Sequence, residues 1–359
     1  MSDALTNPES DRELSRPRRL RRRASDGGVI ATARDVAEAA GVSTASVSRA
    51  LNAPDLVRPE LRDRVAQAVA ELGYVRNGAG RALASLRSGI IGVVFPCLDD
   101  GLHDCILAAL ESGLRASGYL LAVAVAGPTE AAEQTRKLLS LGVEGIVSVG
   151  ADSADVRALA ESRQIPCIEI AADSLASNSN CISMDFTRAA MTVARYLHGL
   201  GHRRFAVFGG PAAKSALWSS RHAALQQAIG ALAGISVIEV SRMVPTFEMT
   251  AEAASHLVRQ PLSPTAIVCA DDVTAVAVVK GCEHVGAAVP RDVSVTGFGD
   301  VEWCRYARPA LTTLRLPVAD AGLAAADQLL ALLAGRTVVR APLVARLIVR
   351  GSSGPPTAP

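Results

Sequence analysis

The 359-residue chain contains no apolar run that approaches the ~20 residues a helix needs to cross a bilayer. Its apolar stretches, such as residues 89–95 and 120–126, have the length of buried strands. No apolar segment follows the first residues in the manner of a secretory signal peptide. These absences argue against a membrane-spanning or exported protein, so we expect a cytoplasmic one.

The chain also lacks a CxxC pair, because its seven cysteines are odd in number and scattered. A disulfide framework or a zinc site is therefore not indicated, and we interpret the cysteines as reduced, mostly buried residues. The HxxxH spacing of His198 and His202 contains Gly199 and Gly201 and lacks the glutamate of an HExxH motif. We predict no metal site.

Motifs for nucleotide chemistry and covalent catalysis are missing as well. Gly78-x-Gly80 lacks the third glycine and the strand–helix context of a dinucleotide-binding loop, and no GxxxxGK[ST] is present. The serine, histidine and aspartate residues form no nucleophile-elbow motif. We therefore expect neither an enzyme nor a bound cofactor.

What the chain does have is an uneven distribution of charge. Its net charge is only +2, yet residues 16–88 hold 14 arginines and 7 acidic residues, a net charge of +7. Residues 89–359 hold 22 basic and 24 acidic residues, a net charge of −2. A basic front on a near-neutral body is typical of a polyanion-binding module. The alternative interpretation of the six arginines within residues 16–23 is a tail that only increases solubility.

The sequence around residue 40 predicts two short helices. Thr32-Ala-Arg-Asp35 has the layout of a capping box, so a helix is predicted to begin at Ala33. Gly41 suits a tight turn, and Ser43 is a good cap for a second helix over residues 44–51. Helix, short turn and helix form the helix-turn-helix plan.

A third helix, from Pro59 to Gly73, would close a three-helix core. On the second helix Val47 and Leu51 would face this core and leave Arg49 on the outer face. Arg49 can donate two hydrogen bonds to guanine, worth about 1–3 kcal/mol of discrimination, although a phosphate or an acidic neighbour is the alternative partner. The apolar spacing that predicts the third helix is that of Leu61, Val65, Val69 and Leu72.

The stretch from Thr32 to Asn52, continued by Glu71-Leu-Gly-Tyr74, resembles the headpiece signature of the lactose/galactose repressor family. This resemblance implies a hinge that becomes helical on operator DNA and wedges Leu83 into the minor groove. Arg76 replaces the usual hinge proline and Gly80 the usual alanine, so we expect a looser hinge, with a plain linker as the alternative. The DNA-binding residues that the pattern implies are Thr32, Arg34, Thr44, Ala45, Ser48, Arg49, Asn52, Tyr74, Asn77, Arg81 and Leu83.

Beyond residue 88, short apolar runs alternate with amphipathic stretches. This alternation predicts an α/β fold with parallel sheets covered by helices on both faces, in two lobes with a ligand cleft between them. The candidate strands are residues 90–95, 120–126, 145–149, 167–170, 205–208, 235–240, 266–269 and 293–296. The candidate helices lie near residues 104–117, 130–141, 153–163, 187–200, 219–232, 248–259, 271–287 and 317–334.

The body resembles the same family in Leu200-Gly-His-Arg-Arg-Phe205, in the stretch from Val289 to Phe298 and in Leu311-Thr-Thr313. The resemblance implies a periplasmic-binding-protein-like (type I) two-lobed fold, with lobes interleaved through crossing segments and dimerisation through the body. The domains that we expect are a flexible basic arm at residues 1–30, the helix-turn-helix headpiece at 31–76, a hinge at 77–88, the two-lobed body at 89–350 and a disordered tail at 351–359.

Effector roles follow from the same resemblance. Arg221 falls where the family has an arginine at the start of a helix entering the cleft, and its guanidinium could grip carboxylate or hydroxyl oxygens. Asp271 stands at a usual asparagine position, and Phe247 stands where an aromatic ring commonly stacks on a sugar. A structural salt bridge or a helix cap is the alternative role for each of the candidate effector residues, which are Asp99, Asp100, His103, Arg221, Phe247 and Asp271.

The loop Gly297-Phe-Gly-Asp300 lacks, at Gly299, the aspartate with which sugar-binding members hold a hydroxyl. This loop, with Glu302 and the stretch from Leu51 to Val57, resembles the gluconate-regulator branch, which implies an anionic effector such as a sugar acid. The sequence thus predicts a homodimeric, nucleoid-associated repressor under allosteric control. The alternative is a solute-binding protein with the same body fold, against which the headpiece and the missing signal peptide argue.

Overall fold

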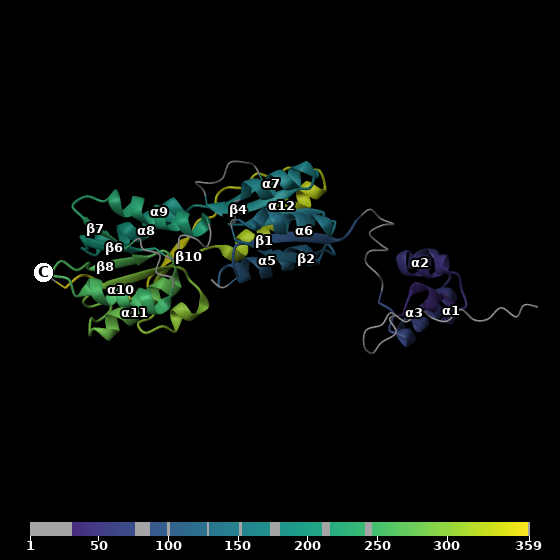
Figure 1. Cartoon of the computed structure of the whole chain (residues 1–359), viewed down its shortest axis with the longest axis horizontal. Helices are drawn as coiled ribbons and strands as arrows, with labels where there is room; N and C mark the ends of the chain where they lie inside the picture. The colour runs from purple at the N-terminus through teal and green to yellow at the C-terminus, as the bar shows by residue number, and fades with distance from the viewer. Residues whose placement is uncertain are drawn as a thin grey trace, which may run out of the picture. The chain divides into compact units, whose positions relative to one another are not determined.

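A computed structural model describes residues 31–75, 87–98, 101–127, 129–150, 153–172, 180–209, 216–240 and 246–357. The chain divides into two compact units, Met1–Gly80 and Arg81–Pro359, which are described separately (Figure 1). Among the described residues, no helix combines the length and the apolar character that a membrane span requires. The predicted arm at residues 1–30 and most of the predicted hinge lie outside the described residues.

The first unit holds three helices, α1 (Ala33–Ala39), α2 (Thr44–Asn52) and α3 (Pro59–Leu72), with the short 3₁₀ helix η1 (Pro54–Leu56) between the last two. The predicted capping box is present at the start of α1. Gly73 ends α3 with φ +57°, a left-handed conformation that glycine adopts without strain. The helices pack around a cluster of small side chains: Val36, Ala37, Ala40, Val47, Ala50, Val65 and Ala68.

The first lobe of the second unit is built on a five-stranded parallel sheet of order β2-β1-β3-β4-β5. On one face the sheet contacts α5 and α12, and on the other α6 and α7. The elements, in chain order, are β1 (Ile90–Phe95), α5 (His103–Arg115), β2 (Leu120–Val125), α6 (Ala131–Ser140), β3 (Gly145–Val149), α7 (Ser153–Ser162), β4 (Cys167–Ala172) and β5 (Cys181–Met184).

Alternation along β1 accounts for this two-sided burial. Ile91 and Val93 pack in the cluster that contains Leu110 of α5, whereas Val94 packs in the cluster that contains Leu138 of α6. A strand buried on both faces reads as a continuous apolar run, which is why the sequence predicted β1, β3 and β4 well.

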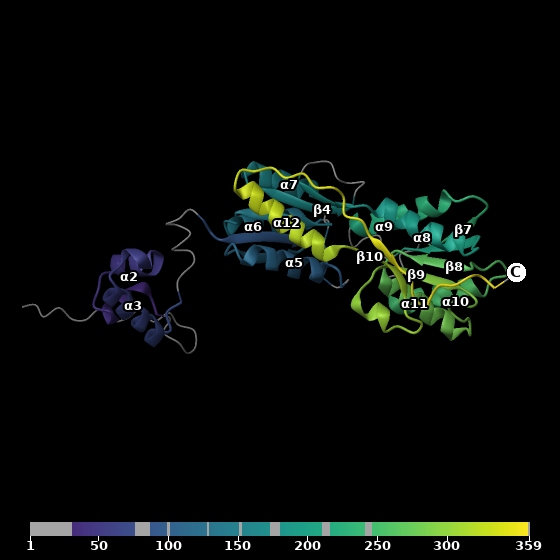
Figure 2. The same cartoon turned by 180° about the vertical axis from the view of Figure 1, so that it is seen from behind.

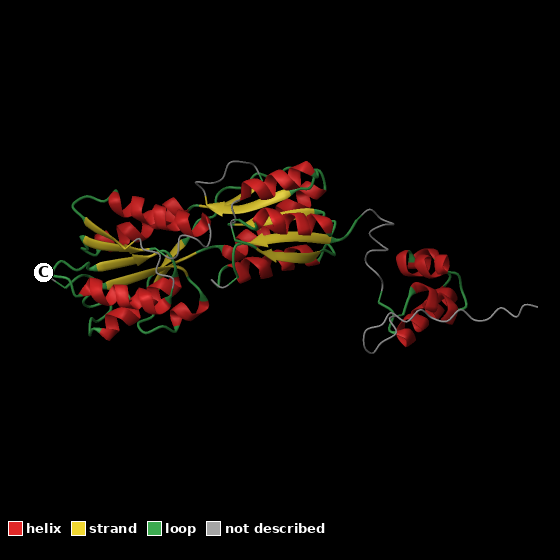
Figure 3. Ribbon diagram, in the orientation of Figure 1, coloured by secondary structure: helices red, strands yellow, loops and turns green. Residues whose placement is uncertain are grey.

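The second lobe has a six-stranded sheet of order β11-β10-β9-β8-β6-β7, parallel except for the β10–β11 pair. In Figure 3, helices cover both faces of this sheet. Its elements are α8 (Phe186–Gly199), β6 (Arg204–Phe208), α9 (Ala216–Gly230), β7 (Ser236–Val240), α10 (Phe247–Val258), β8 (Ala266–Cys269), α11 (Asp272–His284), β9 (Ser294–Gly299), η3 (Glu302–Arg305), β10 (Thr312–Arg315) and β11 (Arg346–Ile348).

The two lobes are interleaved. After β10 the chain leaves the second sheet, and α12 (Val318–Leu333) packs on α5 and on β4 of the first lobe (Figure 2). The chain returns through Leu343, which pairs with Met184 at the end of β5, and enters β11. These crossings confirm the interleaved, two-lobed fold that the family resemblance implied.

Two expectations differ from the structure. The short strands β5, β10 and β11 were not predicted, because each contains polar residues, whereas β8 is equally short but apolar throughout and was predicted. The predicted disorder at 351–359 is wrong for residues 351–357. There Ser352 is buried, and its hydroxyl donates to the Val295 carbonyl (2.6 Å) and accepts from the Thr312 amide (2.8 Å). The last two residues lie outside the described part.

Candidate DNA interface and effector pocket

Helix α2 presents one continuous polar face to solvent. Val47 and Ala50 are buried in the headpiece core, which fixes the rotation of the helix. Ser43 accepts a hydrogen bond from the Ser46 amide (3.1 Å) and so caps the helix at its start. The residues left exposed are five of the candidate DNA-binding residues: Thr44, Ala45, Ser48, Arg49 and Asn52.

Two of these residues are tied to each other, since the Asn52 amide donates to the Ser48 hydroxyl (3.0 Å). Arg49 is exposed on the same face. Its guanidinium can donate up to five N–H hydrogen bonds from a planar fork. The face therefore combines one long cationic donor with short hydroxyl, methyl and amide groups.

The remaining headpiece candidates have different surroundings. Thr32 and Arg34 are exposed at the start of α1, where the Thr32 hydroxyl donates to Asp35 (2.8 Å) and lowers the pKa of that carboxyl. Tyr74 packs, partly buried, against the headpiece core. The other three candidates, Asn77, Arg81 and Leu83, lie outside the described residues.

The folded headpiece is not itself basic. Residues 31–75 contain five arginines and six acidic residues, so the positive charge of the front lies in the flanking segments 16–23 and 76–87. The recognition face of α2 therefore offers shape and hydrogen-bonding groups, whereas attraction to a polyanion must come mainly from the flanks.

In the second unit, an arginine and two aspartates gather among apolar side chains around a small cavity of about 10 Å³, which has room for about one water molecule. Leu102 comes from the first lobe, just before α5, and the other lining residues come from α9, the start of α11 and the end of β9. The lining residues are Leu102, Trp218, Arg221, Asp271, Asp272, Val273, Phe298 and Val301.

Arg221 is only 2% exposed, an unusual burial for an arginine. Its guanidinium carbon lies 5.5 Å from the ring centre of Phe186 and 5.7 Å from that of Phe298. These two rings meet edge to face with centres 5.6 Å apart. Cation–π attraction to both rings holds the guanidinium within the cavity wall.

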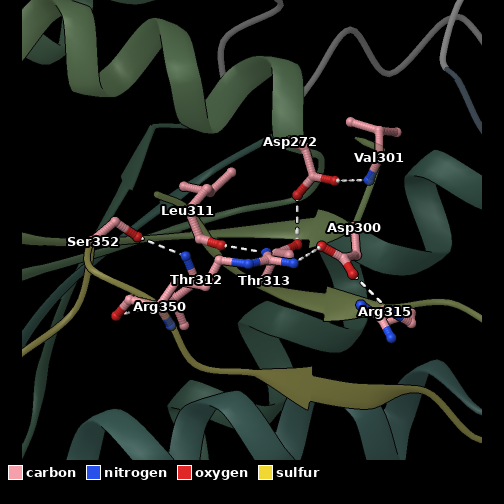
Figure 4. Close-up of polar contacts among 9 residues, drawn as sticks. All are labelled: Asp272, Asp300, Val301, Leu311, Thr312, Thr313, Arg315, Arg350 and Ser352. Atoms are coloured by element: carbon pink, nitrogen blue, oxygen red, sulfur yellow. Dashed lines mark hydrogen bonds and ion pairs between the residues drawn. The ribbon is translucent and has the colours of Figure 1, made fainter. Parts of the chain in front are cut away.

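The two aspartates are committed to local hydrogen bonds. Asp271 caps α11 by accepting from the amide (2.8 Å) and the hydroxyl (2.6 Å) of Thr274. Asp272 accepts from the hydroxyl of Thr313 and from the Val301 amide (3.1 Å; Figure 4). Burial raises the pKa of both carboxyls, and these hydrogen bonds oppose the shift.

Asp272 also explains the glycines of the β9 loop. A Cβ on Gly297 would lie 2.2 Å from Asp272 Oδ1, and one on Gly299 would lie 2.9 Å from Oδ2. Gly299 moreover has φ +140°, a conformation that other residues rarely adopt. The aspartate that sugar-binding members carry at this position is therefore incompatible with the place that Asp272 occupies here.

The structure brings two of the predicted effector residues, Arg221 and Asp271, into the cavity wall. His103 instead packs against Phe95 (ring centres 5.5 Å apart), with its Nδ1 3.6 Å from the Cys97 sulfur. Phe247, at the start of α10, is 38% exposed. Neither of these two is among the described residues that line the cavity. The remaining candidates, Asp99 and Asp100, lie outside the described part.

Sequence reasoning missed six of the lining residues. Two had a local signal, because Trp218 precedes Arg221 by three positions on one helix and Asp272 follows Asp271 directly. The others reach the cavity only through tertiary packing: Leu102, Val273, Phe298 and Val301.

The cysteines and histidines form no obvious chemical site. Five of the seven cysteines are buried, and burial raises the pKa of Cys181 to about 11 and that of Cys167 and Cys282 to about 12. Such thiols stay protonated at neutral pH. In the described part of the chain, no three side chains of metal-ligating type come together.

Comparison with known proteins agrees with both units. Residues 32–77 match the family described as "Bacterial regulatory proteins, lacI family", and residues 194–353 match "Periplasmic binding protein-like domain". The chain is 30% identical over 333 residues to the HTH-type transcriptional repressor CytR of Escherichia coli. This match covers 90% of this chain and 96% of CytR.

A similar match is found with the HTH-type transcriptional regulator GntR of Pseudomonas aeruginosa, 31% identical over 314 residues, 86% of this chain and 90% of that protein. Among solved structures, the lac repressor dimer bound to operator and the anti-inducer ONPF has a TM-score of 0.80 at 26% identity, covering 91% of this chain and 100% of that one. The resemblance drawn from the sequence is thus confirmed, and the chain belongs to the lacI family of bacterial regulatory proteins.

Proposed function

We propose that this protein is a homodimeric transcriptional repressor whose affinity for operator DNA is set by a small anionic effector. The observation that carries the proposal is the exposed face of α2, with Arg49 outward on a folded helix-turn-helix. The lac repressor structure to which the chain is similar is a dimer bound to operator, and we extend that arrangement to this chain.

In this proposal, the two headpieces of the dimer occupy adjacent major-groove half-sites of a pseudo-palindrome. Arg49 donates to guanine O6 and N7, and Ala45 offers a methyl contact to thymine. The arginine-rich segments that flank the headpiece contact phosphates, which makes binding depend steeply on salt. Leu83 of the hinge would act as the minor-groove wedge.

The effector half of the proposal rests on the cavity around Arg221. Its walls are mostly apolar, and its volume of about 10 Å³ holds no more than about one water molecule, so an effector must displace the lining side chains or part the lobes as it binds. A carboxylate would pair with Arg221 by charge-assisted hydrogen bonds. Asp271 and Asp272 already accept hydrogen bonds from Thr274, Thr313 and the Val301 amide, which offset part of their negative charge next to such an anion. A sugar acid carries the required charge.

Effector binding would change the fit between the lobes and shift the population of DNA-competent dimers. We propose a nucleoid-associated, cytoplasmic regulator without catalytic activity or cofactor. A solute-binding protein with the same body fold is the second candidate, but solute transport requires no helix-turn-helix unit with an exposed face of α2.

The DNA half is tested by selecting genomic fragments with the full chain and measuring affinity by fluorescence anisotropy. Arg49→Ala should weaken specific binding by about 30-fold or more, because a bidentate guanine contact is worth about 1–3 kcal/mol and the dimer loses two of them. Arg64→Ala, on the exposed side of α3, removes the same charge and should have a much smaller effect. Equal losses would remove Arg49 from base readout. Failure of the chain to retain any fragment in low salt would overturn the regulator assignment.

The effector half is tested by repeating the anisotropy titration with D-gluconate and a panel of other sugar acids. A sugar acid should change operator affinity in the wild-type chain, and Arg221→Ala should abolish that response without weakening DNA binding in its absence. A normal response from Arg221→Ala would show that the ligand does not use this cavity.

A further inference from the structure

Asp300, the residue after β9, carries a buried carboxylate held by two arginines. Its side chain is 2% exposed, and its backbone has φ +61°, a left-handed conformation that is uncommon outside glycine. Oδ2 lies 2.6 Å from Arg315 Nε and Oδ1 lies 2.7 Å from Arg350 Nη2 (Figure 4). A charge buried this deeply requires its partners, since removing one leaves an uncompensated ion.

The two arginines belong to the segments that cross between the lobes. Arg315 is the last residue of β10, where the chain leaves for α12 in the first lobe. Arg350 follows β11, where the chain returns. Arg350 also donates to the Leu311 carbonyl (2.7 Å), so it contacts the residue that precedes β10 as well as Asp300. A single carboxylate thus ties together two of the crossings.

The residue that follows Asp300 in the chain reaches the cavity. Val301 lines the cavity, and its amide donates to Asp272, which also accepts from Thr313 of β10. The Val301 side chain also meets the first lobe, because a Cβ on Gly101 would lie 3.0 Å from Val301 Cγ1. Val301 therefore lines the cavity and touches the opposite lobe. It is the direct chain neighbour of Asp300, whose carboxylate holds the crossing segments.

We propose that Asp300 is a positioning residue that couples the cavity to the crossing segments. Its bonds to Arg315 and Arg350 favour the lobe arrangement described here, and a displacement of Val301 by a ligand would be passed through Asp300 to β10 and to the strand that follows α12. The regulatory meaning of this coupling rests on the proposed function. The ion pairs of Asp300 with Arg315 and Arg350 belong to the second unit alone.

The three residues should not contribute equally. Arg350 is 15% exposed and makes a second hydrogen bond, whereas Arg315 is 50% exposed. Exposed ion pairs are worth little, while a buried partner is costly to remove. Loss of Asp300 or Arg350 should therefore release the lobes strongly, and loss of Arg315 only in part.

The chain has two tryptophans, which allow a ligand-free test. Trp218 lines the cavity and is 9% exposed, whereas Trp303 is 39% exposed. In a Trp303→Phe background, acrylamide quenching of Trp218 in the full chain reports how often the cavity opens. Asp300→Asn and Arg350→Gln should raise the quenching constant about twofold or more, as expected if roughly half of the molecules open. Arg315→Gln should raise it by a smaller amount.

Arg291→Gln is the matched control, because Arg291 pairs with Asp292 in the same lobe but is 69% exposed. It should leave Trp218 quenching unchanged. If Asp300→Asn folds, a lowered melting temperature with unchanged quenching would make Asp300 a merely structural residue and overturn the proposal. If it does not fold, Arg315→Gln and Arg350→Lys decide: unchanged quenching in both would overturn the proposal, and a graded rise would support it. Neither DNA nor effector enters this measurement, so its failure is distinct from failure of the proposed function.

Discussion

The proposed DNA-binding face of α2 leaves its polar side chains in solvent, whereas the proposed effector cavity buries an arginine and two aspartates. On α2 the desolvation cost arises only when a partner binds, so substitutions there should change binding and leave folding intact. In the cavity much of that cost is already met by hydrogen bonds within the fold, so the same side chains serve stability and recognition at once. The two regions should therefore respond differently to equivalent changes.

The largest expected difference in melting temperature comes from making the same Val→Ala substitution in the core of each compact unit. Val47 of the headpiece and Val147 of β3 are both fully buried. Each Val→Ala change should cost about 2 kcal/mol. The headpiece is small, so its melting temperature should fall by roughly 8–16 °C, against roughly 4–8 °C for the body. Calorimetry of the full chain, which should show two transitions, makes the measurement.

The comparison assumes that the two compact units unfold independently. Val47→Ala should move only the headpiece transition, and Val147→Ala only that of the body. A single transition that moves with both substitutions would show that the units unfold as one, and the distinction between them would then not hold for stability.

The same contrast explains what the sequence could predict. The outer face of α2 follows from local signals: the cap at Ser43, the turn at Gly41 and the buried position of Val47. The cavity joins Leu102 to Val301, residues nearly 200 positions apart, and no local pattern relates them. The crossing strands β10 and β11 contain polar residues and so lack an apolar run, and the docking of Ser352 depends on acceptors that only the folded sheet provides. Arg221 and Asp271 were placed through family resemblance rather than through periodicity.

A smaller effect should separate two glycines of the body. Gly299 and Gly118 both have positive φ, but a Cβ on Gly299 would meet Asp272 Oδ2 at 2.9 Å, whereas one on Gly118 would meet nothing within 4 Å. Gly118→Ala should therefore cost about 1 kcal/mol and Gly299→Ala about 2–3 kcal/mol, the excess arising from displaced Asp272 and from the more restricted backbone. Urea unfolding measures both, and equal costs would show that the packing of Asp272 on Gly299 contributes nothing.

The smallest expected effect is a difference in pH dependence between an aspartate of each region. Burial raises the pKa of Asp272, whose carboxyl faces Thr313, the Val301 amide, Cys304 and Asp271. Because its folded pKa lies above the unfolded value of 3.8, its contribution to stability is fully present below 3.8 and is lost as pH rises through the folded pKa. The wild-type body should therefore gain stability relative to Asp272→Asn as pH falls from 7 toward 4. The gain should be about 1.4 kcal/mol for each pKa unit by which folding raises the pKa of Asp272.

Asp35 of the headpiece should behave in the opposite way. The Thr32 hydroxyl lowers its pKa, so its contribution is present above 3.8 and is lost only as pH falls through the lower folded value. The difference between wild type and Asp35→Asn in the headpiece transition should then stay level from pH 7 to 4 and shrink below that. Calorimetric scans across this range measure both differences. A level difference for Asp272→Asn would mean that its carboxyl is no harder to ionise in the fold than in the unfolded chain, and burial beside the cavity would then have no electrostatic effect on it.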